Sequence, residues 1–177
     1  MLRLHPLSTC VLALAFLGPL QASASELAPA AVTFAPGYQA PFKRKYGARE
    51  IPVLRSDVVR AVSQSLKAAG GRCTRRLDVT IERAAPTTPT IKQQMDNPTL
   101  SPFRTVYRDS GAALQGHVLG PGGHALETVE YQHFNGYAPG LSPARDPWSE
   151  ARVAIEAFST RLVNACVKQS AATSQAP

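Results

Sequence analysis

The stretch AALQGHVLGPGGHALETVEYQHF, residues 112–134, decides the fold class of this chain. It contains two runs with strand character, 112–119 and 125–134, on either side of Gly120-Pro121-Gly122-Gly123. A glycine-rich turn between two such runs is the sequence signature of a β-hairpin. The chain is therefore predicted to contain an antiparallel sheet.

Shorter segments upstream of the hairpin extend this sheet. Residues 77–82 alternate apolar and polar side chains, which is typical of a strand with one buried face and one solvent-exposed face. Residues 103–107 resume strand character, and Ala31-Val32-Thr33-Phe34 could form a short strand. We therefore expect three to four strands.

Two amphipathic helices are predicted, one on each side of the strands in sequence. The first begins at Ser56 as N-cap, with Asp57 complementing the helix dipole, and ends at Gly70-Gly71. The second begins at Asp146, with Pro147 in its first turn. Apolar side chains at three- and four-residue spacing define their buried faces: Val58, Val59, Val62, Leu66 and Ala69 in the first, and Ala151, Ala154, Ile155, Phe158, Leu162, Ala165 and Cys166 in the second. The predicted fold class is α+β, an antiparallel sheet of three to four strands with two amphipathic helices packed on one face.

The N-terminus has the three parts of a secretory signal peptide. Arg3 supplies the basic region, residues 11–17 the apolar run, and Ala22 and Ala24 an A-x-A cleavage site. The run is too short to span a bilayer, and no later segment is apolar enough, so we expect no transmembrane segment. The predicted organisation is a signal peptide over 1–24, an N-terminal arm with the short strand over 25–55, a single α+β domain over 56–168, and a disordered tail over 169–177. The mature protein is expected in the periplasm or outside the cell.

Cleavage would remove Cys10 and leave two cysteines, Cys73 and Cys166. An even number of cysteines in an oxidising compartment predicts a disulfide, which here would close a loop of 166 − 73 = 93 residues. Two free buried thiols are the alternative. Cys73 as a nucleophile beside neighbouring arginines is a further one.

The net charge of +7 favours anionic neighbours. The cluster of Lys43, Arg44, Lys45 and Arg49 is the candidate contact for an anionic envelope component, with an ordinary solvated face as the alternative. Because exported nucleic-acid binders are uncommon, no nucleic-acid partner is expected.

The proline-rich segment 85–102 is the most suggestive functional feature. A loop of this length inside a domain is either functional or disordered. Its centre offers amide groups and an adaptable apolar side chain, as a partner-binding loop would. The candidate contact residues are Ile91, Gln93, Gln94, Met95, Asp96 and Asn97. A disordered spacer is the alternative.

No catalytic constellation, cofactor motif or familiar metal spacing is found in the sequence, so we expect a protein that is not an enzyme. His117, His124 and His133 lie around the hairpin and are the best metal or ligand candidates, but no other residues complete a zinc-binding pattern. Three functions are left open: an envelope adaptor or accessory binding module, a small-ligand or metal-binding module using these histidines, and a hydrolase with an unfamiliar site.

The arrangement resembles small periplasmic proteins and auxiliary envelope lipoproteins of Gram-negative bacteria. Segments 56–71, 77–82, 114–134 and 148–166 carry the resemblance. It implies a non-enzymatic adaptor or accessory subunit of an envelope assembly. This chain differs from the lipoprotein members because it has no lipid-attachment cysteine after its apolar run.

Overall fold

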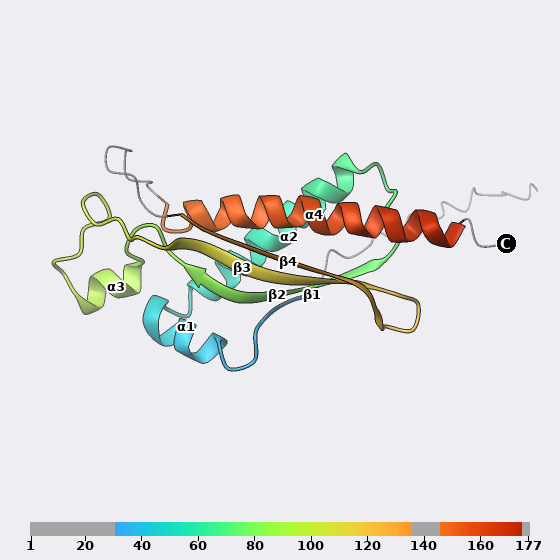
Figure 1. Ribbon diagram of the computed structural model, residues 1–177. Helices are drawn as coiled ribbons and strands as arrows, with labels where there is room; N and C mark the ends of the chain where they lie inside the picture. The colour runs from blue at the N-terminus through green and yellow to red at the C-terminus, as the bar shows by residue number, and fades with distance from the viewer. Residues whose placement is uncertain (1–30, 136–145, 175–177) are drawn as a thin grey trace, which may run out of the picture.

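The computed structural model describes residues 31–135 and 146–174 and has an α+β fold (Figure 1). In chain order the elements are β1 (Ala31–Phe34), α1 (Gln39–Tyr46), α2 (Glu50–Ala68), β2 (Arg76–Ala85), α3 (Ile91–Asp96), β3 (Ser110–Leu119), β4 (Ala125–Asn135) and α4 (Ser149–Ser174). The predicted signal peptide and its cleavage site lie outside the described residues.

The four strands form one sheet in the order β1-β2-β3-β4. The hairpin prediction is confirmed: β3 and β4 are antiparallel, with His117 opposite Thr128. β2 and β3 are also antiparallel, but β1 runs parallel to β2, so the sheet is mixed and not wholly antiparallel as expected. The reason is the connection, because α1 and α2 lie between these two strands and return the chain in the same direction.

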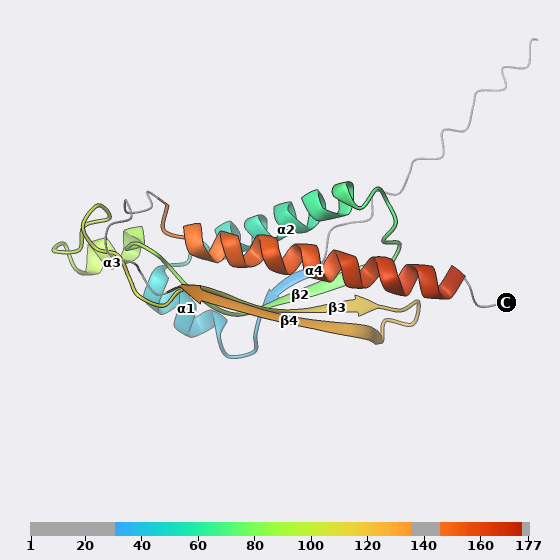
Figure 2. The ribbon, with the colours of Figure 1, turned by 45° about the horizontal axis from the view of Figure 1, so that its top comes forward.

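Two helices cover one face of the sheet, as predicted. α4 lies across β3 and β4, and α2 packs beside α4 and contacts β1 (Figure 2). Leu114 and Val118 of β3 point to this face, together with Val79 of β2, and all three are buried. The opposite face carries alternate side chains that are mostly polar, such as Thr80 and His117, and are only partly buried.

A disulfide joins Cys73, just before β2, to Cys166 in α4, with 5.3 Å between the Cα atoms. This prediction is confirmed, so neither cysteine is a free thiol or a nucleophile. α4 begins at Ser149, three residues later than predicted, so Asp146 and Pro147 lie before the helix. The Asp146 carboxylate accepts a hydrogen bond from the Trp148 amide at 2.8 Å.

The tail prediction is wrong over much of its length, because α4 continues to Ser174. Gln169 donates a hydrogen bond to Glu127 of β4 at 2.9 Å, which ties the helix to the sheet beyond its apolar stripe. Residues 175–177 lie outside the described part.

The predicted N-terminal arm is part of the folded domain. Its short strand is confirmed as β1, but the rest of the described arm forms α1 and the start of α2. α2 begins at Glu50, so Ser56 lies inside the helix and is not its cap. Pro41 and Pro52 do not interrupt these helices, because each occupies a first turn, where no amide hydrogen bond is lost.

Two further local expectations need correction. Asp57 was expected to complement the helix dipole, but it is buried within α2 and pairs with Arg60 and Arg152. Residues 103–107 form no strand; the Thr105 amide instead bonds to the Ser101 carbonyl in a turn. Phe103, the first residue of this segment, is largely exposed.

Candidate binding surface around α1 and α3

The predicted loop 85–102 contains a helix, α3, that is fixed at its N-terminus. Thr90 and Gln93 form a capping box, in which each side chain accepts a hydrogen bond from the other residue's backbone amide. The Thr90 hydroxyl also donates to the Tyr46 carbonyl at 2.9 Å and so fastens α3 to the end of α1. The centre of the loop is therefore an ordered element and not a spacer.

Most polar side chains of the predicted contact loop bond within the loop itself. Gln94 donates to the Pro89 carbonyl at 3.0 Å, and Asp96 pairs with Lys92 at 2.7 Å. The Asn97 side chain accepts from Thr99 at 2.7 Å. These groups hold the shape of the segment, so the amides singled out from the sequence are largely occupied.

The apolar members of the loop are the ones that face outward. Ile91 is 54% exposed and Met95 is 77% exposed, although both belong to an ordered helix. They line a hollow of about 310 Å³ between α3 and the start of α2, which Tyr46 and Arg49 also line. We call this the outer hollow.

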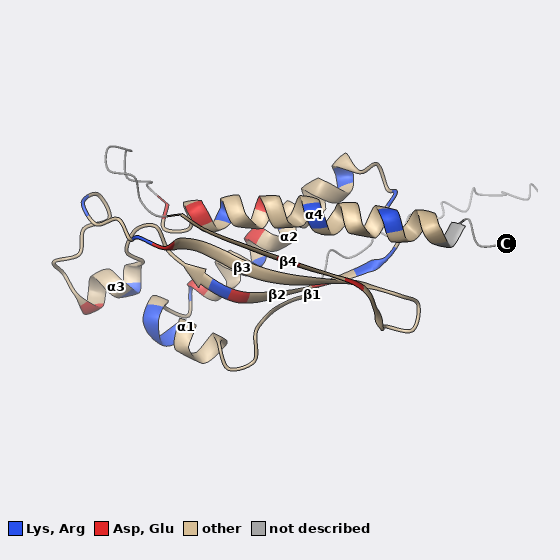
Figure 3. Cartoon of the chain, in the orientation of Figure 1, with Lys and Arg blue, Asp and Glu red and all other residues tan. Residues whose placement is uncertain are grey.

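The basic cluster predicted from the sequence lies beside this hollow. Lys43, Arg44 and Lys45 form the last turn of α1, where they complement the negative end of the helix dipole (Figure 3). Arg49 directly precedes α2 and lines the outer hollow. None of these four side chains pairs with a carboxylate of the described residues. The structure therefore brings the predicted basic cluster and the predicted contact loop together.

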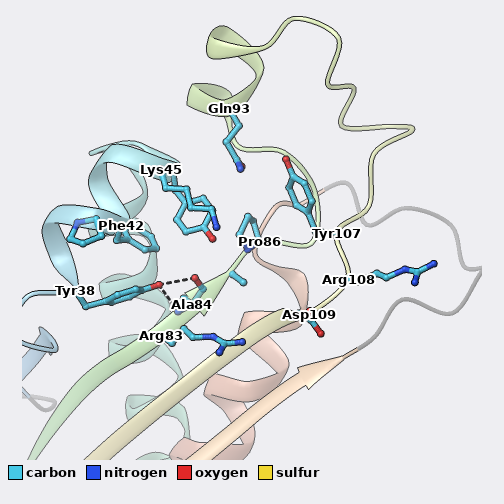
Figure 4. Close-up of a pocket in the computed structure, with 13 residues that line it drawn as sticks. Tyr38, Phe42, Lys45, Arg83, Ala84, Pro86, Gln93, Tyr107, Arg108 and Asp109 are labelled. Atoms are coloured by element: carbon cyan, nitrogen blue, oxygen red, sulfur yellow. Dashed lines mark hydrogen bonds between the residues drawn. The ribbon is translucent and has the colours of Figure 1, made fainter.

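A second hollow, of about 410 Å³, adjoins the first and is also lined by Tyr46 (Figure 4). Its walls come from α1, the end of β2, Gln93 of α3 and residues 107–109. We call this the inner hollow. The Tyr38 hydroxyl lies in its wall, where it donates to the Ala84 carbonyl and accepts from the Ala84 amide, each at 2.9 Å.

Burial raises the pKa of the Tyr38 hydroxyl and also that of Tyr107, which lines the same hollow. Both side chains therefore stay neutral hydrogen-bonding groups well into the alkaline range. Tyr38, Arg83 and Tyr107 could not be predicted from the sequence, because these residues come from separate parts of the chain and share no motif.

The hairpin histidines do not converge. His117 lies on the uncovered face of the sheet, with its Nδ1 atom 3.0 Å from the Thr128 hydroxyl. His133 lies on the face covered by α4, 3.8 Å from Glu150, and His124 sits in the turn beside Gly120. Within residues 31–135 and 146–174, no group of three His, Cys, Asp or Glu side chains could hold a metal ion.

Comparison with known proteins adds no relative. No protein-family model matches the chain, and searches of curated proteins and of solved structures found no match. Among the described helices, none is both long enough and apolar enough to cross a membrane.

Proposed function

We propose that this protein is an exported, non-enzymatic envelope protein that acts as an adaptor or accessory binding module. The observation that carries the proposal is the exposure of Ile91 and Met95 on a helix that is capped and bonded to its neighbour. Solvent-exposed apolar side chains on an ordered helix are a feature of protein contact sites. The outer hollow and the basic cluster are then the contact surface.

The chemistry of this surface indicates what a partner presents to it. An apolar side chain of the partner would enter the outer hollow between Ile91 and Met95. Acidic groups around that side chain would lie against Arg49 and the neighbouring Lys43 and Arg44, which have no carboxylate partner among the described residues. The two carboxylates that line the hollow, Glu50 and Asp96, are already bonded to Trp148 and Lys92. The preferred partner is thus an envelope protein with an apolar anchor and an acidic rim.

Two observations support export. The N-terminal pattern is that of a cleavable signal peptide, and the Cys73–Cys166 disulfide is of a kind that persists in oxidising compartments. We expect the protein recovered from its native cells to begin at Ser25 and to fractionate with the periplasm or the medium. N-terminal sequencing that finds Met1 on the accumulated protein would contradict this part of the proposal.

The contact surface can be tested with a photo-crosslinking amino acid placed at Met95 in the native cell. We expect one dominant crosslinked envelope protein, which disappears when Ile91→Asp is added. Val153 provides the matched control, because it is also an exposed apolar residue on a helix, 51% exposed, but belongs to α4.

The control crosslinker at Val153 should not give the same species, and Val153→Asp should leave the Met95 crosslink unchanged. Identical products from both positions, or a Met95 product that survives Ile91→Asp, would argue against this surface. Circular dichroism of each variant shows whether the fold is retained.

The alternative function, a small-ligand or metal-binding module built on the hairpin histidines, remains a prediction. It is not favoured by the positions of His117 and His133 on opposite faces of the sheet.

A further inference from the structure

We infer that the inner hollow binds a small organic anion, a carboxylate or phosphate attached to an apolar ring. The inner hollow adjoins the outer hollow, since Tyr46 lines both, and Lys45 of the basic cluster lines the inner one. The inference rests on the lining of the inner hollow alone and does not depend on the proposed adaptor function. At about 410 Å³ the inner hollow has the size of a small-molecule site.

The charge of the inner hollow favours an anion. Its lining includes three cations, Lys45, Arg83 and Arg108, and one carboxylate, Asp109. None of the three cations forms an ion pair with a carboxylate of the described residues. The donors of Lys45 and Arg83 are therefore available for the head group of a ligand, whereas the Arg108 side chain points away from these two (Figure 4).

Two of these cations are held in place by aromatic rings. The Arg83 guanidinium lies 4.0 Å from the centre of the Phe134 ring, and the Lys45 ammonium lies 5.1 Å from that of Tyr46. A cation–π contact positions the charged group but leaves its N–H donors without an acceptor, so they can bind a ligand. A planar guanidinium that is already oriented suits a carboxylate or phosphate, which it can bind through two parallel hydrogen bonds.

The remaining walls favour an apolar ring next to the anionic group. The accessible rings are those of Tyr38 and Tyr107, which are only partly buried, while Phe42 and Pro86 lie buried behind them (Figure 4). The Tyr107 amide donates to the Thr87 carbonyl at 2.8 Å, which fixes this wall of the hollow against the end of β2. The two tyrosine rings offer flat apolar surfaces, against which a ring can stack.

The backbone beside the hollow is strained. Asp109 has a φ angle of 60°, and it is the one non-glycine residue of the described part with positive φ. Such conformations cost free energy and are concentrated at ligand sites. The strain accompanies the three-residue segment that places Tyr107, Arg108 and Asp109 at the hollow.

The test is an NMR titration of the ¹⁵N-labelled, disulfide-bonded protein with phenyl phosphate, benzoate, inorganic phosphate and benzyl alcohol. We expect saturable shifts confined to residues lining the inner hollow with phenyl phosphate or benzoate. The relative affinity of these two probes distinguishes a phosphate from a carboxylate ligand. Inorganic phosphate lacks the ring and benzyl alcohol lacks the charge, so both should bind more weakly.

Arg83→Gln should weaken binding of the better probe by about tenfold or more, since a charge-assisted hydrogen bond is lost. Arg161→Gln is the matched control. Like Arg83, Arg161 stacks on an aromatic ring, with its guanidinium 4.3 Å from the centre of the Tyr131 ring, but it does not line the hollow. Lys45→Gln, on the exposed surface of α1, is a second variant should Arg83→Gln not fold. Because Lys45 also belongs to the basic cluster, its effect on probe binding is compared with that of Lys43→Gln, which does not line the inner hollow.

Shifts scattered over the surface, equal binding of benzyl alcohol, or equal losses in Arg83→Gln and Arg161→Gln would overturn the inference. Ile91→Asp should bind the anionic probes like the unchanged protein. The outcome at the inner hollow is therefore separable from the outcome at the adaptor surface.

Discussion

Gly116 lies in β3 where the strand passes beneath α4. A Cβ atom built at this position would lie 2.7 Å from the Phe158 ring and 2.9 Å from a Leu162 methyl group. Both side chains are fully buried, so neither can move aside freely. The absence of a side chain at Gly116 therefore lets the helix approach the sheet.

At this position we predict that Gly116→Ala lowers the free energy of unfolding by about 1–3 kcal/mol, the usual cost of overpacking a core. Gly122→Ala is the control, because Gly122 lies in the exposed hairpin turn and should change stability by less than about 0.5 kcal/mol. Urea unfolding followed by circular dichroism measures both. Equal effects of the two substitutions would contradict the close approach seen at β3.

The Tyr38 side chain takes the place of a neighbouring strand at the end of β2. Because β1 ends opposite Ile81, the Ala84 amide and carbonyl have no strand partner on that side and bond to the Tyr38 hydroxyl. Tyr38→Phe removes both bonds, and we expect a loss of about 1–3 kcal/mol in the free energy of unfolding.

The raised pKa of Tyr38 adds a pH dependence to this loss. Burial makes the folded protein hold the phenolic proton more tightly than the unfolded chain, whose tyrosine titrates near 10.0. The resulting stability is present below pH 10.0 and is lost as the pH rises past it. The free energy of unfolding should therefore fall less steeply above this pH in Tyr38→Phe than in the unchanged protein. Parallel curves in urea titrations at several alkaline pH values would show that Tyr38 makes no such contribution.

At the scale of elements, Asp57 connects the two long helices. Its buried carboxylate accepts from Arg152 of α4 at 2.8 Å and from Arg60 of its own helix at 2.6 Å. Hydrogen bonds to Asp146 and Asp57 raise the pKa of Arg152 in spite of its partial burial, which opposes them. The same arginine thus ties α2 to the start of α4.

The two partners of Asp57 should contribute unequally. Arg152→Gln is expected to lower the free energy of unfolding by about 1–3 kcal/mol, because it leaves the buried Asp57 carboxylate without its link to α4. Arg60 is 56% exposed, so Arg60→Gln should cost less than about 1 kcal/mol. Thermal and urea unfolding of the two variants compare them directly, and similar losses would show that the link between helices is unimportant.

At the scale of the whole molecule, the disulfide links the chain before β2 to the second half of α4. It closes a loop of 93 residues, so it restricts a large part of the unfolded chain. We expect the double substitution Cys73→Ala and Cys166→Ala to lower the free energy of unfolding by about 2–4 kcal/mol. Urea unfolding of this variant, and of the unchanged protein with and without reductant, measures the effect. An unchanged unfolding midpoint after complete reduction would refute it.

Local signals in the sequence determined much of this fold. The hairpin around Gly120-Pro121-Gly122-Gly123, the alternating strand of β2 and the capped α4 depend on short-range periodicity and turn residues, so they could be read directly. The cysteine pair also followed from counting, because the expected loss of Cys10 leaves two of the three cysteines, which allow a single intramolecular pairing. The helices of the predicted arm were missed, because Pro41 and Pro52 in their first turns are as compatible with a helix start as with a loop.

Only the tertiary structure decided the direction of β1, the order within segment 85–102 and the composition of the two hollows. Strand direction depends on the whole connection through α1 and α2, which no window of sequence contains. The inner hollow joins residues 38–46, 83–86, 93 and 107–109, which meet only after the chain has packed. From the sequence alone, Lys45 was part of a basic cluster and Gln93 part of a loop. Their common site exists because Thr90 bonds to Tyr46 and brings α3 against α1.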